Sequence, residues 1–261
     1  MRPIAVAFLL LGIAVSTGAA PVRAATVADQ TELRMAPDPA KRREALGRLI
    51  ANQRELPFRC PEIPEPVMAL QLQPFYRADD PSQSTIDKER LEAYRVESLR
   101  AFTEGTNALA DYYVGTKPRD GRIASCWADW VERWADKGAL LANPATAQGN
   151  AERKWMLASI ALNYALVADA SEIEPARREK IESWIGRLAR AWLEAPDYGF
   201  DSPNNHVNWG ALALMAAGAA VNDRTFFDKG VELARLGLAQ IDADGSAPLE
   251  LRRGDRGITD Q

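Results

Sequence analysis

The chain has 261 residues, a formal net charge of −4 and a single histidine, and 47% of its residues are hydrophobic. No block of basic residues offsets this acidic balance, so nucleic acid is not expected as a partner, although a polyanion could still bind where positive groups gather in one cleft. One histidine and scattered acidic residues offer no cluster of metal ligands, and no Gly-rich phosphate loop follows a strand pattern. We therefore expect neither a metal nor another cofactor.

The first 24 residues have the pattern of a secretory signal peptide. Arg2 precedes an apolar run over residues 4–15, and small residues follow up to Ala24, where we place the cleavage site. The run is too short to span a membrane as a helix. We expect residues 25–261 to be a periplasmic protein that is not membrane-bound, a monomer and a single domain, because no linker composition divides them.

The sequence contains two cysteines, Cys60 and Cys126. In an oxidising compartment they are plausible disulfide partners. The alternative is a pair of free buried thiols.

The first part of the chain predicts two helices separated by loops. A helix is predicted over residues 39–54, and one long charged helix over residues 86–113. Between them, the proline-rich run 57–66 predicts extended chain. Residues 70–84 are typical of a loop, which could close over a ligand or be an ordinary surface excursion.

The second part of the chain alternates between two kinds of helix. Three tryptophans at spacings of three and four predict a buried aromatic face on a helix over residues 122–140. Helices that are apolar on nearly all sides then alternate with amphipathic ones, over residues 152–168, 175–194, 207–221 and 224–241. No strand pattern of period two occurs at length. We therefore predict an all-α fold, a toroid of helical hairpins that each place one helix inside and one outside.

A dense polar cluster over residues 201–210 stands where one of the apolar helices begins, and it contains the only histidine. His206 falls in the first turn, where unpaired backbone N–H groups and the helix dipole favour an anionic ligand. Asn204 and Asn205 add amide donors, and Trp209 adds a flat apolar face. Trp155 is expected near the start of another inner helix, and so in the same cleft as His206. The cluster is typical of a binding site, but it also fits an ordinary helix cap with a surface histidine.

Several separate motifs in this sequence resemble the alginate lyases of the toroidal polysaccharide lyase group. They are the run Asn204-Asn205-His206 with Trp209, the run Arg153-Lys154-Trp155 with Gln148 before it, and the segments 126–134 and 248–253. The resemblance covers about residues 57–256. It implies an enzyme that cleaves mannuronate-rich alginate, a polyanionic polysaccharide, by β-elimination: the C5 proton is removed, the C4 oxygen leaves and a C4–C5 double bond remains.

The resemblance also implies catalytic roles for three residues. The C5 proton is a poor acid while the neighbouring carboxylate keeps its charge, so donors that neutralise the carboxylate are the largest contribution such a site can make. Asn205 and Arg253 match the neutralising positions of the family. His206 matches a histidine that removes the proton or shares the carboxylate charge, and the sequence leaves both roles open.

Further residues match positions that hold the substrate. Gln148 and Trp155 match subsites for neighbouring sugars, with Trp155 stacking on a ring. Tyr76 and Arg77 lie where the family carries its lid. A solvated glutamine and a core tryptophan are the alternatives for the first two.

The sequence departs from the family near its end. The catalytic tyrosine of the family lies seven residues after the arginine matched by Arg253, and that position here is Asp260. An exposed aspartate carries no proton at neutral pH, so it cannot readily replace a phenol that donates one. The sequence then stops before the residues that complete the toroid in the family. We therefore expect a C-terminally truncated lyase with weak or absent activity, with a non-catalytic uronate-binding protein or an inactive remnant as alternatives.

Overall fold

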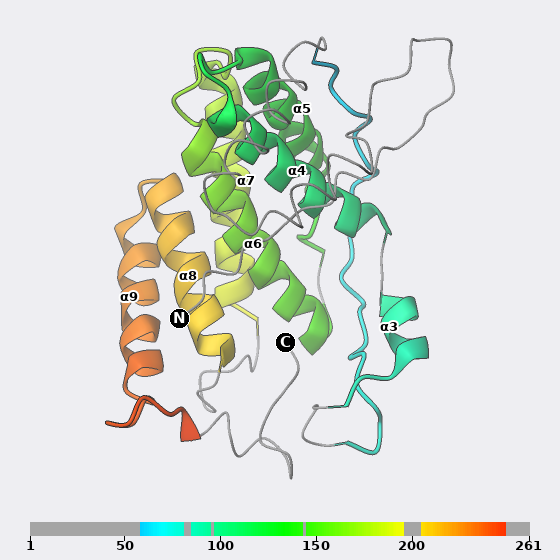
Figure 1. Cartoon of the computed structure of the whole chain (residues 1–261), viewed down its shortest axis with the longest axis vertical. Coiled ribbons are helices and arrows are strands. Elements are labelled where there is room, and N and C mark those ends of the chain that lie inside the picture. The colour runs from blue at the N-terminus through cyan, green and yellow to red at the C-terminus, as the bar shows by residue number, and fades with distance from the viewer. Residues whose placement is uncertain (1–57, 81–84, 95–96, 143–144, 196–204, 249–261) are drawn as a thin grey trace, which may run out of the picture. The chain divides into compact units, whose positions relative to one another are not determined.

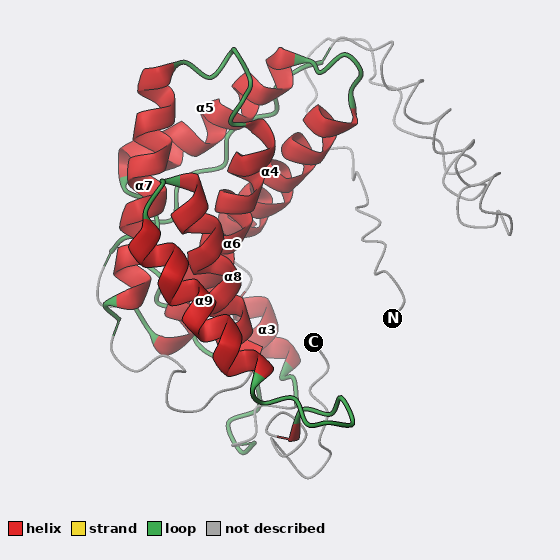
Figure 2. Cartoon of the chain, turned by 90° about the vertical axis from the view of Figure 1, so that its left-hand side faces the viewer, coloured by secondary structure: helices red, strands yellow, loops and turns green. Residues whose placement is uncertain are grey.

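The computed structural model describes residues 58–80, 85–94, 97–142, 145–195 and 205–248. Within these ranges every regular element is a helix, and pairing of β type is confined to an isolated antiparallel bridge between Tyr76 and Ile86 (Figure 2). Among the helices so described, none has both the length and the hydropathy that crossing a membrane requires. The predicted signal peptide and the predicted helix over residues 39–54 lie outside the described residues. The described residues from Glu62 onward belong to one compact unit, which contains the helices below.

Three helical hairpins in this unit form two layers (Figure 1). In one layer α4 (Glu97–Gly115) contacts α6 (Ala147–Val167), which contacts α8 (Asn205–Ala220). The hairpin partners are α5 (Gly121–Lys137), α7 (Pro175–Leu193) and α9 (Arg224–Leu238), which pack on α4, α6 and α8 respectively. The predicted pairing of these helices into hairpins is confirmed.

The helix ends follow from local sequence. The side chains of Asp120, Thr146 and Asp223 cap α5, α6 and α9 by accepting hydrogen bonds from backbone N–H groups in the first turn. Pro175 opens α7, where its missing N–H costs nothing. Gly138 ends α5 in the left-handed conformation, with φ of 63°.

The aromatic face predicted for α5 is buried. Trp127 and Trp134 are fully buried and Trp130 nearly so. Phe102 of α4 stacks on Trp134 with ring centroids 3.8 Å apart. Trp134 also donates a hydrogen bond from Nε1 to the carbonyl oxygen of Pro64 at 3.0 Å, so the chain at Pro64 is held against this helix.

The prediction of one continuous helix over residues 86–113 is wrong. The structure has two helices there, α3 (Lys88–Tyr94) and α4. The apolar positions of the two helices have different partners: Tyr94 packs edge-on against Phe75 at 5.0 Å, whereas Phe102 packs against the tryptophans of α5. The apolar positions that look like one continuous stripe in the sequence therefore pack against two different parts of the protein.

The prediction for α6 needs two corrections. The helix begins at Ala147, five residues before the predicted start, because Thr146 caps it by accepting a hydrogen bond from the Gly149 N–H. Trp155 therefore lies about two turns inside the helix and not near its start. The helix is also not buried on all sides, since Leu162 and Leu166, on the same face as Trp155, are 43% and 40% exposed.

Candidate active site at the start of α8

The imidazole of His206 lies in the first turn of α8, as predicted, and contacts two consecutive residues of α6. The Nζ atom of Lys154 is 2.8 Å from Nδ1 of His206 and 3.4 Å from the His206 carbonyl oxygen. The ring centroids of Trp155 and His206 are 5.8 Å apart. The fold thus brings together the histidine and the tryptophan that the sequence assigned to one cleft.

Lys154 is the least expected part of this arrangement, because its side chain is fully buried. Lysine is rarely buried unless its ammonium group has partners. Burial disfavours the charged form and lowers the pKa of Lys154 to about 7. The ammonium group also lies 5.5 Å from the centre of the Trp155 ring, close enough for a cation–π attraction.

Arg153 is also fully buried, but its contacts differ from those of Lys154. Its guanidinium donates to the carbonyl oxygens of Leu140 at 2.8 Å and Ala142 at 3.1 Å, in the segment before α6, and to that of Ala191 at 3.3 Å, in α7. It also donates to Oδ1 of Asn150 at 2.8 Å. Arg153 therefore ties α6 to α7 and to the chain that precedes α6.

A second polar cluster lies at the start of α6. The Tyr94 hydroxyl of α3 donates a hydrogen bond to the Glu152 carboxylate, and the buried Gln148 side chain also bonds to Tyr94. Burial raises the pKa of Glu152, against the opposing effect of the Tyr94 hydrogen bond. Burial, together with the Glu152 carboxylate, raises the pKa of Tyr94. Gln148, assigned to a sugar subsite, therefore belongs to a connected set of polar groups.

The predicted lid residues lie on a loop that contacts α3. Tyr76 pairs with Ile86 through the isolated bridge, and its carbonyl oxygen accepts a hydrogen bond from Arg90. Arg77 forms two hydrogen bonds to Asp79, at 2.9 Å and 2.6 Å. These bonds raise the pKa of Arg77 and lower that of Asp79.

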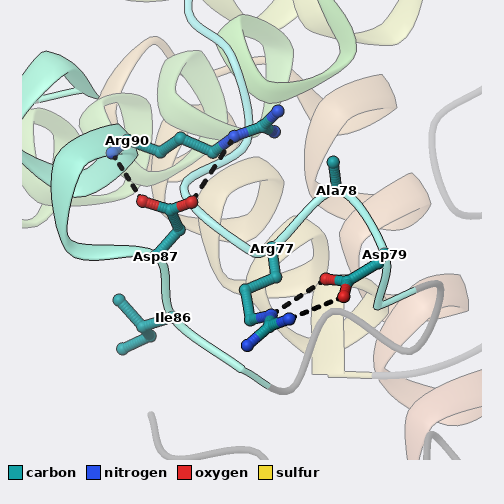
Figure 3. A pocket seen from close by; sticks show the side chains of 6 residues that line it. All are labelled: Arg77, Ala78, Asp79, Ile86, Asp87 and Arg90. Atoms are coloured by element: carbon teal, nitrogen blue, oxygen red, sulfur yellow. Dashed lines mark hydrogen bonds and ion pairs between the residues drawn. The ribbon is translucent and has the colours of Figure 1, made fainter.

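An open hollow of about 450 Å³ lies beside this loop (Figure 3). Its lining residues are Arg77, Ala78, Asp79, Ile86, Asp87 and Arg90. Each arginine in it is paired with an aspartate, Arg77 with Asp79 and Arg90 with Asp87. Among the predicted site residues, Arg77 lines this hollow whereas His206 and Trp155 do not.

The other predicted residues have mixed outcomes. Asn205 is the first residue of α8 and is half-buried, and Trp209 is 41% exposed. Cys60 and Cys126 are both disulfide-bonded. Arg253 and Asp260 lie outside the described residues. In the described ranges, no group of three or more His, Cys, Asp or Glu residues could hold a metal ion.

Three contributors to this region were given no role from the sequence: Lys154, Tyr94 and Glu152. A signal for the first was present. A lysine in a helix predicted to be buried must bring its ammonium group to a polar partner. Tyr94 and Glu152 are 58 positions apart, and no local pattern joins them.

Comparison with known proteins now places this chain in a family. A model of the family described as alginate lyase matches residues 71–259. This chain belongs to the alginate lyase family. The match begins inside the region of resemblance expected from the sequence and extends three residues beyond it.

Alginate lyases of two species are among its relatives. The alginate lyase of Azotobacter vinelandii is 32% identical over 210 residues, which cover 76% of this chain and 55% of the relative. An alginate lyase of Pseudomonas putida is 31% identical over 215 residues, covering 77% of this chain and 56% of the relative. The chain thus spans about half the length of these alginate lyases.

Solved structures show the same fold. Alginate lyase A1-III from Sphingomonas species A1 aligns with a TM-score of 0.65 at 21% identity, covering 77% of this chain and 57% of that chain. A variant of A1-III complexed with a tetrasaccharide aligns with a TM-score of 0.68 at 23% identity, covering 88% and 62%. The prediction of an all-α fold of the α/α toroid type is confirmed.

Proposed function

We propose that this alginate lyase family member binds alginate and cleaves it by β-elimination at the start of α8. The observation that supports this most is the contact of His206 with Lys154 and Trp155 at a helix N-terminus. Such a terminus favours a carboxylate, and an aromatic ring suits the apolar face of a sugar. Uronate residues carry both features.

The arrangement divides the work among the residues. Asn205 approaches the uronate carboxylate and reduces the charge that opposes loss of the C5 proton, and the imidazole of His206 either shares that charge or takes the proton. Trp155 and Gln148 hold the neighbouring sugars. The guanidinium of Arg253 supplies a further positive charge in this proposal.

The test is the release of unsaturated uronate ends, followed by ultraviolet absorbance with polymannuronate as substrate. The chain should produce absorbance at a low rate that rises with its concentration, because Asp260 stands at the position of the family's tyrosine. His206→Ala should lower kcat by at least a further ~10²-fold, since loss of a charge-stabilising or proton-transferring group typically costs that much. Asn205→Ala has a matched control one turn along the same helix. Asn208→Ala removes the same amide from an exposed position facing α9 near Gly237, and should leave the rate unchanged.

Equal rates for the two asparagine variants would contradict the role given to Asn205. Product formation by the His206→Ala variant at the rate of the unmodified chain would contradict the whole assignment of the site.

A second candidate function is binding without cleavage, which is favoured by Asp260 at the position of the family's tyrosine. A carboxylate there does not supply the proton that the leaving oxygen needs. In this case polymannuronate raises the melting temperature of the chain by mass action, but no absorbance develops. A chain that neither binds nor cleaves the polymer would exclude both functions.

Three finer properties are part of the proposal. Preference for mannuronate is tested by comparing polymannuronate with polyguluronate. Export to the periplasm through a signal peptide cleaved after Ala24 is tested by the mass of the N-terminal peptide in a periplasmic fraction. A monomeric state is tested by light scattering.

A further inference from the structure

The contact between Lys154 and His206 bears on which tautomer the imidazole adopts. The two nitrogen atoms, Nζ and Nδ1, are 2.8 Å apart, a hydrogen-bond distance. An ammonium group donates and cannot accept, so Nδ1 must be the acceptor when Lys154 is charged. A neutral imidazole whose Nδ1 accepts carries its proton on Nε2.

The surroundings favour this arrangement over its reverse. The second contact of Nζ, 3.4 Å from the His206 carbonyl oxygen, is also one in which the lysine donates. A second proton on the ring would place two positive charges 2.8 Å apart, one of them on the buried Lys154 side chain. Burial lowers the pKa of Lys154 to about 7, so near and below neutral pH a large fraction of the amine is the donor-only ammonium.

We infer that Lys154 is a positioning residue that holds His206 as the neutral tautomer protonated on Nε2. On the proposed function, on which this inference rests, the Nε2–H of the imidazole is then available to donate a hydrogen bond to the uronate carboxylate.

The single histidine makes this inference directly measurable. Chain labelled with ¹⁵N only in histidine, and purified without a histidine tag, gives the two ring nitrogen signals of His206 alone. A protonated and an unprotonated ring nitrogen have distinct ¹⁵N shifts, and couplings to the ring carbon-bound protons assign Nδ1 and Nε2. In the unmodified chain near pH 7 we expect Nδ1 to be the unprotonated nitrogen.

Variants separate a positioning role from a merely structural one. Lys154→Met keeps the apolar stem and removes the donor, so the ¹⁵N signals should move toward a mixture of both tautomers. Lys154→Arg keeps a donor and should preserve much of the original pattern. The control is Ser159→Ala, which removes a 2.7 Å hydrogen bond to Asn107 on the α4 side of the same helix and should leave both signals in place.

Two results would overturn the inference: a proton on Nδ1 in the unmodified chain, or a Lys154→Met spectrum with the original tautomer. If Lys154→Met does not fold, the spectra of the unmodified chain and of Lys154→Arg still decide the question.

Activity is a separate readout. A chain with the inferred tautomer that makes no product from polymannuronate refutes the proposed function alone, whereas an active chain with the reversed tautomer refutes this inference alone. Where the chain is active, Lys154→Met should lower kcat/KM at least about tenfold, because a histidine that is not held in the required tautomer is impaired in catalysis.

Discussion

Exchanging glycine for alanine at two helical positions should change stability in opposite directions. Gly149 lies in the first turn of α6, where the chain at Leu70 crosses it closely. A Cβ atom added at Gly149 would stand 1.9 Å from the Leu70 carbonyl oxygen and 2.8 Å from its carbonyl carbon. The same atom added at Gly186, in α7, would meet nothing within 4 Å.

The magnitudes follow from two competing effects. Alanine is favoured over glycine in a helix by about 1 kcal/mol, whereas overpacking costs about 1–3 kcal/mol, and the upper end applies here because the obstacle is backbone. Gly149→Ala should therefore lower the free energy of unfolding by about 2 kcal/mol. Gly186→Ala should raise it by about 0.5–1 kcal/mol.

Urea unfolding followed by far-ultraviolet circular dichroism measures both variants against the unmodified chain. The Gly149→Ala melting temperature should fall by about 4–8 °C for a protein of this size. The carbonyl oxygen of Leu70 also accepts hydrogen bonds from the backbone N–H and the hydroxyl of Thr146, so the crossing cannot simply move away. Equal or greater stability of Gly149→Ala, or a shift of both variants in one direction, would refute the close crossing.

Three other substitutions test side-chain contacts that join the helices. Arg153→Met should lower the free energy of unfolding by about 3–5 kcal/mol, because it leaves buried carbonyl oxygens unpaired; a smaller loss than that caused by Gly149→Ala would argue against the tie. Burial raises the pKa of Glu152 above its unfolded value of about 4.3, so its stabilising contribution is present at low pH and is lost as the pH rises through the folded pKa. Glu152→Gln keeps an acceptor for Tyr94 and should show no such loss in denaturant titrations across that range. Glu132→Gln removes the ion pairs of Glu132 in α5 with two residues of α7, Arg177 at 2.8 Å and Lys180 at 2.7 Å. It should cost about 0.5–1 kcal/mol at low salt and less near 1 M salt.

Periodicity predicted the second half of the fold well, because each of those helices has a local signature. The buried face of α7 and the tryptophans of α5 recur at helical spacing, and both sets are buried in the structure. The sequence pattern failed to predict the first turn of α6, because the residues there are polar and show no apolar periodicity. The start of α6 resembles a loop in sequence, because it contains Gln148, Gly149 and Asn150. Thr146, just before them, is a residue type that favours a helix N-cap and therefore indicates where the helix begins.

The candidate site was predictable only in part. The position of His206 in a first turn follows from the sequence, since a polar cluster precedes an apolar helix. Its contact with Lys154 joins residues 52 positions apart and depends on how α8 packs on α6. The cluster of Tyr94 and Glu152 likewise depends on the separation of α3 from α4, which the continuous apolar pattern conceals.

Arg153 and Lys154 are neighbours in sequence, and consecutive side chains on a helix point about 100° apart. One bonds to α7 and the other to α8, so a single turn of α6 joins α7 to the imidazole. Rotation or slippage of α6 against both neighbours would therefore break the Arg153 contacts and the Lys154 contact together. On gradual heating, the histidine should therefore lose its fixed orientation before the helical signal is lost.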